Sequence, residues 1–404
     1  MDLTIHPCVL HGTICAIPSK SQAHRLLLCA AFADGPTCLP CAATNQDMEA
    51  TAACLRALGA EISYDGSAYR IQPIQSLPKT ALLPCGESGS TLRFLLPVVG
   101  ALGVDGTFSM EGRLPQRPLS PLWEEMERMG CRLSRPSPGQ VRCQGRLRGG
   151  LYRIRGDVSS QFVTGLLFAL SLCREESRLE LVGSVESLPY IQMTLKALER
   201  FGCEIPHRAA VFSIRPAAFH SPGLVPVEGD WSNAAFWLSA AACGSDICLT
   251  GLDASSAQGD RAVTRILPEL EKFQEIDASQ IPDLVPVLAV VAGAKQGARF
   301  VNAGRLRIKE SDRLETTAAL LRDLGGVAQV QGDTLTVEGT GYQGGIVHAA
   351  GDHRIAMAAA IASTVCSRPV TVCGAEAVRK SYPGFWNDFE ALGGILCHPH
   401  TEPF

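Results

Sequence analysis

The sequence predicts an α/β protein of two domains, each holding three strand-helix repeats of about 70 residues. With 404 residues the chain exceeds one ordinary hydrophobic core, so two domains of about 200 residues are expected. Six polar segments each open an apolar run of helical length, and successive openings lie 67, 71, 73, 50 and 72 residues apart. The openings begin near Ser19, Gly86, Asp157, Asp230, Gln280 and Asp352. Because a helix start presents unpaired N–H groups and a partial positive charge, the openings predict anion binding if they face one place.

A second element repeats at the same spacing. Amphipathic helical stretches end in a large apolar residue and glycine, and a strand-like run follows. The pairs are Leu58-Gly59, Met129-Gly130, Phe201-Gly202, Leu324-Gly325 and Leu392-Gly393, and Phe273-Gln274 stands where a sixth is due. Glycine after a helix suits the left-handed cap that turns the chain into a strand. Some matches must be chance in a chain with 39 glycines, but the near-constant spacing favours a repeat.

The domain boundary is expected where the repeats divide three and three. Residues 219–229 are rich in Pro and Gly and fall between the third and fourth repeats. A strand-like stretch at residues 3–14 precedes the first apolar helix and could pair with either half. If the second domain takes it, two chain segments cross between the domains and form a hinge.

Composition narrows the function classes. With 46% hydrophobic and 19% charged residues, the chain is predicted to be soluble and globular, and its net charge of −4 argues against general nucleic-acid binding. No signal segment or membrane-spanning run is recognised, so a cytoplasmic location is expected. The 16 cysteines are scattered through predicted helices and strands, as is typical of core residues in a reducing compartment. Neither the lone CxxC at residues 38–41 nor Cys397-His398-Pro399-His400 predicts a metal site.

Candidate ligand-binding groups gather at the helix openings of the first half. Lys20, Ser21 and Arg25 lie at a loop-to-helix junction and suit a phosphate or carboxylate, although a solvated helix start with a serine cap is the open alternative. The segment at residues 86–93 is rich in small residues but lacks P-loop spacing. Arg113 and Arg117 lie in a Pro-bounded loop, where a ligand clamp explains them better than a surface face does.

Two further polar segments complete the first half. Ser159, Ser160 and Gln161 offer more polar groups than helix capping alone requires. Ser187 and Tyr190 add a hydroxyl pair in the loop before an amphipathic helix.

Acids and bases characterise the second half. Asp283 lies at the mouth of an apolar helix, where it could be catalytic or could simply complement the helix dipole. Residues 305–313 carry four cations among carboxylates, which on a surface would be salt bridges of little consequence. Asp352-His353-Arg354 opens an apolar helix, and residues 379–383 precede the last one.

Together these motifs resemble the family of 5-enolpyruvylshikimate-3-phosphate synthases, the 3-phosphoshikimate 1-carboxyvinyltransferases. The resemblance runs from about residue 17 to 383 and follows the family's order of motifs. The motifs are PSKSQAHR, GESGSTLR, GRLPQRP, VSSQF, SLPYI, IKESDR with the preceding IPD, and DHRIAM followed by RKSYP.

The resemblance implies a two-domain inside-out α/β barrel with three strand-helix repeats per domain and an active site in the interdomain cleft. The first strand then belongs to the C-terminal domain. The expected domains are residues 1–14 with 228–404, and residues 15–227, with a hinge near 14 and 227.

The resemblance also implies roles by position. The residues matching shikimate 3-phosphate contacts are Lys20, Ser21, Arg25, Ser159, Ser160, Gln161, Ser187, Asp283 and Lys309. The residues matching the phosphoenolpyruvate site are Lys20, Gly89, Arg117, Gln161, Arg313, Arg354 and Lys380. Convergent cations and helix starts would offset the mutual repulsion of two anionic substrates.

The reaction that the resemblance implies is an addition followed by an elimination. Asp283 is expected to take the proton of the 5-hydroxyl, while Glu310 and Lys20 carry protons to and from the methylene carbon, and His353 could tune the acid. No metal or organic cofactor is expected, because phosphoenolpyruvate carries its own leaving group. The expected partners are these small substrates, with no nucleic acid and no membrane, and we expect a monomer.

Two departures bear on substrate contacts. Glu87 stands where many family members have Asn in the glycine loop, and Arg305 stands where some have Asn in the substrate-binding loop. Gly89 retains the small residue typical of glyphosate-sensitive relatives, so we expect inhibition by glyphosate.

Two alternatives remain. An enolpyruvyl transferase acting on UDP-N-acetylglucosamine would share fold and donor, but that family typically carries a reactive Cys in the loop corresponding to residues 111–118, which contains none. A non-catalytic anion-binding scaffold would be expected to lose Asp283 or one of the two proton carriers, and all three are present.

Overall fold

The computed structural model describes residues 1–397. The chain divides into two compact units. The N-terminal unit is Pro18–Glu228, and the C-terminal unit combines Met1–Ile17 with Gly229–Phe404. The predicted boundaries near residues 14 and 227 fall close to these divisions.

The N-terminal unit holds three successive sets of helices and strands. The first set is α1 (Lys20–Ala31), β3 (Thr37–Pro40), α2 (Gln46–Ala57), β4 (Glu61–Tyr64) and β5 (Ala68–Gln72). The second is β6 (Thr80–Gly86), α3 (Gly89–Leu102), β7 (Asp105–Met110), the 3-10 helix η1 (Leu114–Gln116), α4 (Leu122–Arg128), β8 (Cys131–Ser134) and β9 (Gln140–Gly145). The third is β10 (Gly150–Arg155), α5 (Ser160–Leu172), β11 (Ser177–Val182), α6 (Leu188–Arg200), β12 (His207–Arg208) and β13 (Val211–Ile214).

The C-terminal unit repeats this order and includes the first two strands of the chain. Its first set is β2 (His11–Cys15), α7 (Trp231–Ala242), β14 (Asp246–Thr250), η2 (Gly259–Ala262) and α8 (Val263–Glu269). The second is β15 (Gln274–Asp277), α9 (Val285–Ala294), β16 (Ala298–Val301), η3 (Gly304–Ile308), α10 (Arg313–Asp323), β17 (Ala328–Gln331) and β18 (Thr334–Val337). The third is β19 (Gly345–His348), α11 (His353–Ser363), β20 (Val370–Cys373), η4 (Ala375–Lys380), α12 (Phe385–Ala391), β21 (Ile395–Cys397) and β1 (Asp2–His6).

One topology recurs in four of the six described sheets. Two parallel strands joined through an apolar helix are extended by an antiparallel pair, as in β6-β7-β9-β8, β10-β11-β13-β12, β15-β16-β18-β17 and β19-β20-β1-β21. The first repeat keeps the antiparallel sheet β3-β5-β4, and the fourth keeps the parallel pair β14-β2. In these four sheets, the repeat predicted from sequence spacing is therefore a βαβα unit completed by an antiparallel pair of strands.

The start of the chain completes the C-terminal unit. The predicted strand at residues 3–14 is two strands: β1 pairs antiparallel with β20 and β21, and β2 pairs parallel with β14. The chain turns between them at residues 7–10, a segment that contains Pro7. Since β14 would otherwise be a lone strand, the N-terminus supplies the fourth repeat with its parallel partner.

The six predicted openings are the starts of α1, α3, α5, α7, α9 and α11. Side chains cap five of them by accepting a backbone N–H, namely Ser19, Ser88, Ser159, Asp230 and Asp352. The start of α9 has no such cap and carries proline in its first turn. Proline at that position removes a backbone donor that would otherwise be unpaired, so the helix can begin without a cap.

The predicted glycine caps are confirmed. The five glycines that follow α2, α4, α6, α10 and α12 all have positive φ: Gly59, Gly130, Gly202, Gly325 and Gly393. The prediction for Phe273-Gln274 is wrong, because α8 ends at Glu269 and Phe273 is exposed. Pro268 lies in the last turn of α8 and donates no backbone N–H, which favours this early end.

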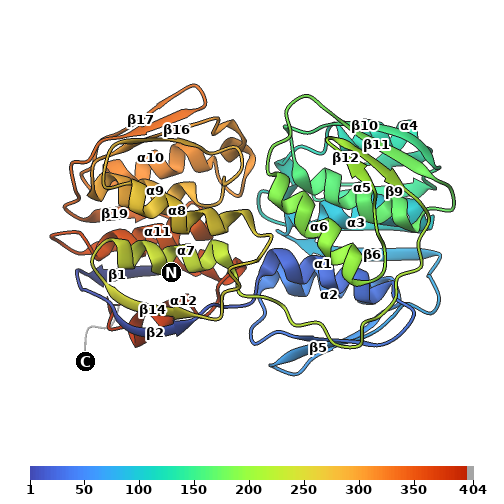
Figure 1. Ribbon diagram of the computed structural model, residues 1–404, viewed down its shortest axis with the longest axis horizontal. Coiled ribbons are helices and arrows are strands. Elements are labelled where there is room, and N and C mark those ends of the chain that lie inside the picture. Colours follow the sequence, from blue (N-terminus) through green and yellow to red (C-terminus); the bar gives the residue numbers. More distant parts are fainter. Residues whose placement is uncertain (398–404) are drawn as a thin grey trace. The chain divides into compact units, whose positions relative to one another are not determined.

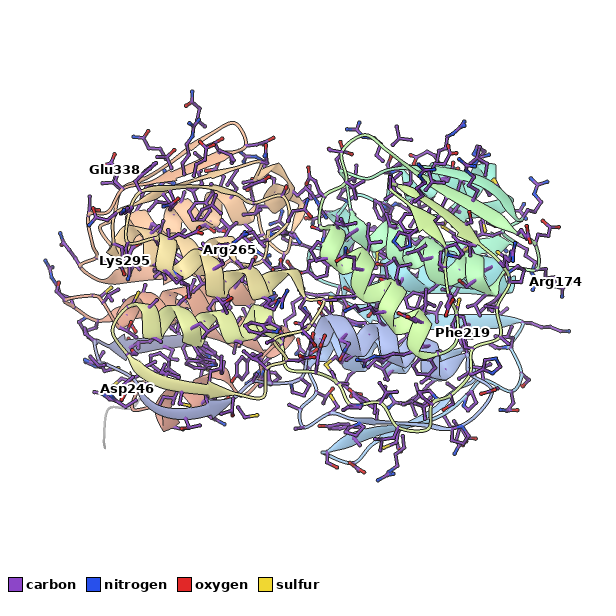
Figure 2. The ribbon with its side chains drawn as sticks, viewed as in Figure 1. Arg174, Phe219, Asp246, Arg265, Lys295 and Glu338 are labelled. Carbon is purple, nitrogen blue, oxygen red and sulfur yellow. The ribbon has the colours of Figure 1, made fainter. Side chains whose placement is uncertain are left out.

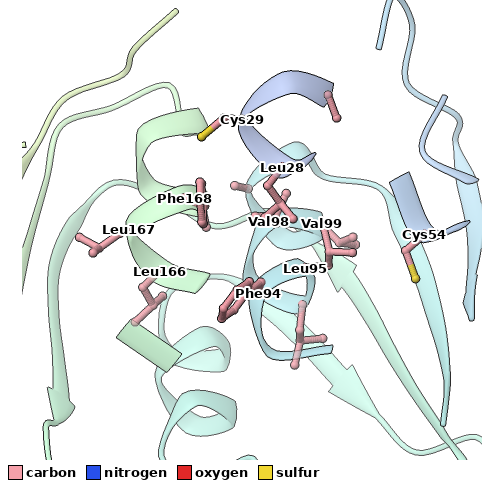
Figure 3. Close-up of a cluster of buried hydrophobic side chains, with 14 of the residues drawn as sticks. Leu28, Cys29, Cys54, Phe94, Leu95, Val98, Val99, Leu166, Leu167 and Phe168 are labelled. Carbon is pink, nitrogen blue, oxygen red and sulfur yellow. The ribbon is translucent and has the colours of Figure 1, made fainter. Parts of the chain in front are cut away.

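Each unit buries its own hydrophobic core around these apolar helices (Figure 1). In the N-terminal unit, Phe94 and Val98 of α3 lie against Leu166 and Phe168 of α5 (Figure 3). Three of the residues labelled in Figure 2, Arg174, Asp246 and Glu338, are exposed and charged. Among residues 1–397, no helix has the length and apolarity that crossing a membrane requires.

Candidate active site

The first opening places Lys20 beside a carboxylate. Lys20 is the first residue of α1, and its Nζ donates to Asp47 Oδ2 of α2 at 2.9 Å. Both side chains are largely buried, so the pair is less screened by water than a surface ion pair. The structure therefore holds this candidate proton carrier against α2.

Arg25 is buried one turn further along α1. Its guanidinium donates to the Thr194 and Thr164 hydroxyls at 2.9 and 3.3 Å and to the carbonyls of Ser21 and Tyr190 at 2.5 and 3.0 Å. Burial lowers the pKa of Arg25 to about 10, so it stays a cation at neutral pH. This predicted substrate contact thus also ties α1 to α5 and α6.

A polar chain links the first two openings beneath Lys20. His24 Nδ1 lies 2.7 Å from the Thr51 hydroxyl, which lies 2.7 Å from the Thr91 hydroxyl. Thr91 in turn donates to Ser88, the cap of α3, at 2.7 Å. Burial lowers the pKa of His24 to about 3, so its ring is neutral.

Two arginines enclose Gly89 at the start of α3. A Cβ added there would lie 2.7 Å from Arg117 Nη1 and 3.2 Å from Arg93 Nη1. Arg93 also donates to Gln161 Oε1 at 2.7 Å, and Gln161 Nε2 donates to Ser90 Oγ at 3.0 Å. Three residues predicted for the phosphoenolpyruvate site, Gly89, Arg117 and Gln161, are therefore brought together through Arg93.

The serine groups lie at two other helix starts of the N-terminal unit. Ser159 caps α5 by accepting the Gln161 N–H at 3.3 Å, and Ser160 begins that helix. Ser187 precedes α6 in the left-handed conformation at φ 53° and is buried. Residues other than Gly, Asn and Asp rarely adopt this conformation, so the surrounding structure must hold Ser187 there.

Asp283 lies two residues before α9 and contacts three cations. Its Oδ1 accepts from Arg313 Nη1 at 2.8 Å and from Lys309 Nζ at 3.4 Å, and its Oδ2 accepts from Arg354 Nη2 at 3.2 Å. Burial alone would raise the pKa of Asp283, but Arg354, Lys309 and Arg313 outweigh it and hold the pKa well below its usual range. Asp283 is therefore an ionised carboxylate at neutral pH, as a general base must be.

Arg313 joins this aspartate to two more carboxylates. It donates to Glu310 Oε2 at 2.6 Å and, from Nε and Nη2, to the two oxygens of Asp352 at 2.9 and 3.2 Å. Despite burial, Asp352, Glu310 and Asp283 hold the pKa of Arg313 above its ordinary value. The candidate base Asp283 and the candidate acid Glu310 thus share one guanidinium.

The other cations predicted for the site, Lys309, Arg354 and Lys380, also lie in the C-terminal unit. Burial lowers the pKa of Lys309 to about 8; Asp283 opposes the shift, whereas Arg313 and Arg305 add to it. Arg354 is buried at the start of α11 and also donates to the carbonyl of Asp283 at 3.2 Å. Lys380 is buried in η4.

The two departures have identifiable surroundings. The Glu87 carboxylate lies against Gly112, leaving no room for a Cβ there, and so faces the loop that carries Arg113 and Arg117. Arg305 acts electrostatically on Lys309. His353 is buried with its Nδ1 4.0 Å from Asp352 Oδ1.

The sequence singled out Asp283 and Glu310 but not two other carboxylates that hold these cations, Asp47 and Asp352. Asp47 is the partner of Lys20 across 27 residues, and Asp352 is the partner of Arg313 across 39. The sequence indicates Asp352 only as a helix opening. The available signal was a carboxylate at a helix start, which indicates capping as readily as ion pairing.

Within residues 1–397, no three His, Cys, Asp or Glu side chains converge as metal ligands would. Cys38 and Cys41 of the CxxC are free thiols, as is Cys397. His398 and His400 of the last Cys/His segment lie outside the described residues.

Comparisons with known proteins show the family of the chain. The family described as EPSP synthase (3-phosphoshikimate 1-carboxyvinyltransferase) matches residues 6–389. The chain is 40% identical to a 3-phosphoshikimate 1-carboxyvinyltransferase of Clostridium kluyveri, covering 98% of both chains, and 38% identical to one of Clostridium perfringens, covering 97% of this chain and 98% of that one.

Solved structures share the fold at lower identity. An EPSP synthase from Acinetobacter baumannii superposes with a TM-score of 0.80 at 22% identity, covering 98% of this chain and 100% of that one. The enolpyruvyl transferase NikO from Streptomyces tendae superposes with a TM-score of 0.77 at 18% identity, covering 98% of each. From the match over residues 6–389 and the relatives that align along nearly their whole length, the chain belongs to the EPSP synthase family.

Proposed function

We propose that the chain transfers the enolpyruvyl group of phosphoenolpyruvate to the 5-hydroxyl of shikimate 3-phosphate and releases phosphate, within aromatic amino-acid biosynthesis. The observation that carries this proposal is the cluster in which Arg313 bridges Asp283 and Glu310 while Lys309 and Arg354 contact Asp283. A base, an acid and three cations in contact suit the chemistry of an anionic enol ether donor.

The addition step uses the base and an acid. Asp283 removes the proton from the 5-hydroxyl, whose oxygen bonds to the enol carbon of phosphoenolpyruvate. Glu310 or Lys20 delivers a proton to the methylene carbon, which becomes a methyl group, and a tetrahedral ketal results. The elimination reverses the proton movement at that carbon, breaks the bond to the phosphate oxygen and leaves the enol ether.

The ion pairs of Asp283 fit a change in basicity during the cycle. A carboxylate held by three cations is a weak base, because they stabilise its ionised form. When Arg313 and Arg354 turn to the anionic groups of phosphoenolpyruvate, Asp283 loses part of this stabilisation and its pKa rises. Asp283 would then become an effective base only when phosphoenolpyruvate is bound.

The remaining site residues form the ligand contacts of the same proposal. Shikimate 3-phosphate is held by Lys20, Ser21, Arg25, Ser159, Ser160, Gln161, Ser187, Asp283 and Lys309. Phosphoenolpyruvate is held by Lys20, Gly89, Arg117, Gln161, Arg313, Arg354 and Lys380.

The proposal also includes a monomeric state, to be measured by sedimentation, and a cytoplasmic location, which the 16 free cysteines support.

The test follows phosphate release from phosphoenolpyruvate with either shikimate 3-phosphate or UDP-N-acetylglucosamine as acceptor. Release with the first acceptor alone is expected; release only with the second would overturn the choice of substrate, and release with neither would overturn the activity.

Asp283→Asn tests the mechanism, with the exposed Asp246→Asn as its control. Loss of a general base typically lowers the rate by about 100- to 10,000-fold. Full turnover in Asp283→Asn would contradict the assigned base, whereas Asp246→Asn should match the parent protein.

A further inference from the structure

A buried carboxyl outside the predicted site lies beneath the opening of α7. Asp260 belongs to η2 and is 1% exposed. Its Oδ2 accepts a hydrogen bond from the Ser232 hydroxyl, while its Oδ1 is buried with no hydrogen-bond partner. A buried carboxyl oxygen without a partner is costly, so its retention calls for an explanation.

The segment around Asp260 holds the α7 opening in place. Gln258, two residues before Asp260, accepts the Trp231 N–H at 3.0 Å and donates to the Gly229 carbonyl at 2.8 Å. Asp230 caps the same helix by accepting the Asn233 N–H at 2.7 Å. This opening is the one to which the sequence motifs assign no role in the reaction.

The α7 opening leads directly to Arg354. The carbonyl of Ser232 accepts from Arg354 Nη1 at 3.4 Å, and the same guanidinium donates to Asp283. Ser232 therefore connects Asp260, through its hydroxyl, with Arg354, through its carbonyl. A change at Asp260 would reach Arg354 and Asp283 through one residue.

Asp260 is also placed to change charge near neutral pH. Burial and the nearby Asp283 and Asp230 raise its pKa to about 7, against the opposing effects of Arg354 and the Ser232 hydrogen bond. The charged groups of the adjoining α8, Arg265 and Glu269, are exposed. The charged groups that act most strongly on the carboxyl are Asp283, Asp230 and Arg354.

We propose that Asp260 is a positioning residue that holds Arg354 through Ser232 and that makes the anion affinity of Arg354 depend on pH. When Asp260 is protonated, an anion at Arg354 meets no repulsion from it. When Asp260 is ionised, its negative charge opposes the anion and competes for the guanidinium. The inference rests on the proposed function in taking phosphoenolpyruvate as that anion.

The experiment measures KM for phosphoenolpyruvate at saturating shikimate 3-phosphate from pH 6 to 9 in the parent protein, Asp260→Asn and Ser232→Ala. Asparagine keeps an acceptor for Ser232 but cannot ionise. KM of Asp260→Asn should equal that of the parent within about twofold at pH 6 and be about tenfold lower at pH 9, the effect of a one-unit interaction. Because substrate ionisation is common to all variants, the ratio of KM values reports on Asp260.

Ser232→Ala tests the proposal independently, because it should shift the pH at which KM for phosphoenolpyruvate rises. Removing the hydroxyl removes a hydrogen bond that lowers the pKa of Asp260. The rise of KM should therefore move to higher pH than in the parent protein. Parallel KM profiles for the parent protein and Asp260→Asn, or a rise at lower pH in Ser232→Ala, would overturn the proposal.

Melting without substrate separates this inference from the proposed function. An aspartate whose pKa is raised on folding makes the folded state progressively less stable as pH rises from about 4 to 7. The melting temperature of Asp260→Asn should exceed that of the parent by more at pH 8.5 than at pH 5.5. A constant difference would refute the titration of Asp260 even in a protein that shows no transferase activity, whereas absent phosphate release alone would refute only the function.

Discussion

Replacing Gly89 by alanine should impair phosphoenolpyruvate binding while leaving the fold intact. The new Cβ would lie 2.7 Å from Arg117 Nη1, closer than Cβ atoms approach other heavy atoms in folded proteins, and 3.1 Å from its Cζ. Because the obstructing group is the end of a flexible side chain, Arg117 can move away at little cost in stability. It would then leave the position from which it is proposed to contact the substrate.

The size of the effect follows from the bond that is displaced. A hydrogen bond to a charged group contributes roughly 1.5–3 kcal/mol, so its loss should raise KM for phosphoenolpyruvate roughly 10- to 150-fold. KM for shikimate 3-phosphate should change much less. Steady-state phosphate release measures both constants, and thermal melting measures stability.

Gly100→Ala, in the same helix, is the matched control. Its Cβ would meet Cys131 Sγ at 2.8 Å and Leu147 Cγ at 3.1 Å in the core. Overpacking costs about 1–3 kcal/mol, of which the helix propensity of alanine offsets up to about 1 kcal/mol. The control should lower the melting temperature without a selective change in KM. An unchanged KM for phosphoenolpyruvate in Gly89→Ala would refute the assignment of Arg117.

Three further predictions concern pH and inhibition. Lys309, with a pKa of about 8, is a cation below that pH, so KM for shikimate 3-phosphate should rise between pH 7 and 9 in the parent protein and stay flatter in Lys309→Arg. His24 stays neutral in the folded state down to about pH 3, so unfolding titrations should show stability falling by up to about 1.4 kcal/mol per pH unit below pH 6.5, and less in His24→Gln. Glyphosate should inhibit phosphate release competitively with phosphoenolpyruvate. Unchanged activity at millimolar glyphosate would contradict the inhibition expected from the small residue Gly89.

Local sequence signals predicted the repeating part of the fold. Helix openings, left-handed glycines and strand-like runs recur because each repeat must solve the same problem of burying an apolar helix and turning into a strand. The prediction failed where a repeat departs from that plan. The fourth repeat ends its second helix at Glu269, before the position expected at Phe273-Gln274. Pro268 is a local signal for that early end, whereas no local signal assigns β2 to either half, since its pairing with β14 across more than two hundred residues depends on tertiary packing.

The candidate site was predicted unevenly for a related reason. The resemblance supplied the cations and the base, because these stand in recognisable motifs. Asp47 and Asp260 stand outside those motifs, and their importance depends on which cation or helix they meet in space. Spacing along a helix predicts neighbours three or four residues apart, whereas these contacts join different elements.

The carboxylates also explain how a chain of net charge −4 can gather so many cations. Arg313 is buried, and an unpaired guanidinium there would be strongly unfavourable, so Asp283, Glu310 and Asp352 neutralise it. An arriving phosphate or carboxylate must compete with carboxylates that are already in place. The substrate gains affinity only for the difference between the two sets of contacts, and each displaced carboxylate becomes more basic as it loses its cation. Under the proposed function, the ion pairs of Arg313 with Asp283, Glu310 and Asp352 would limit how tightly the substrates are held, and their displacement would leave a more basic Asp283 when the 5-hydroxyl must lose its proton.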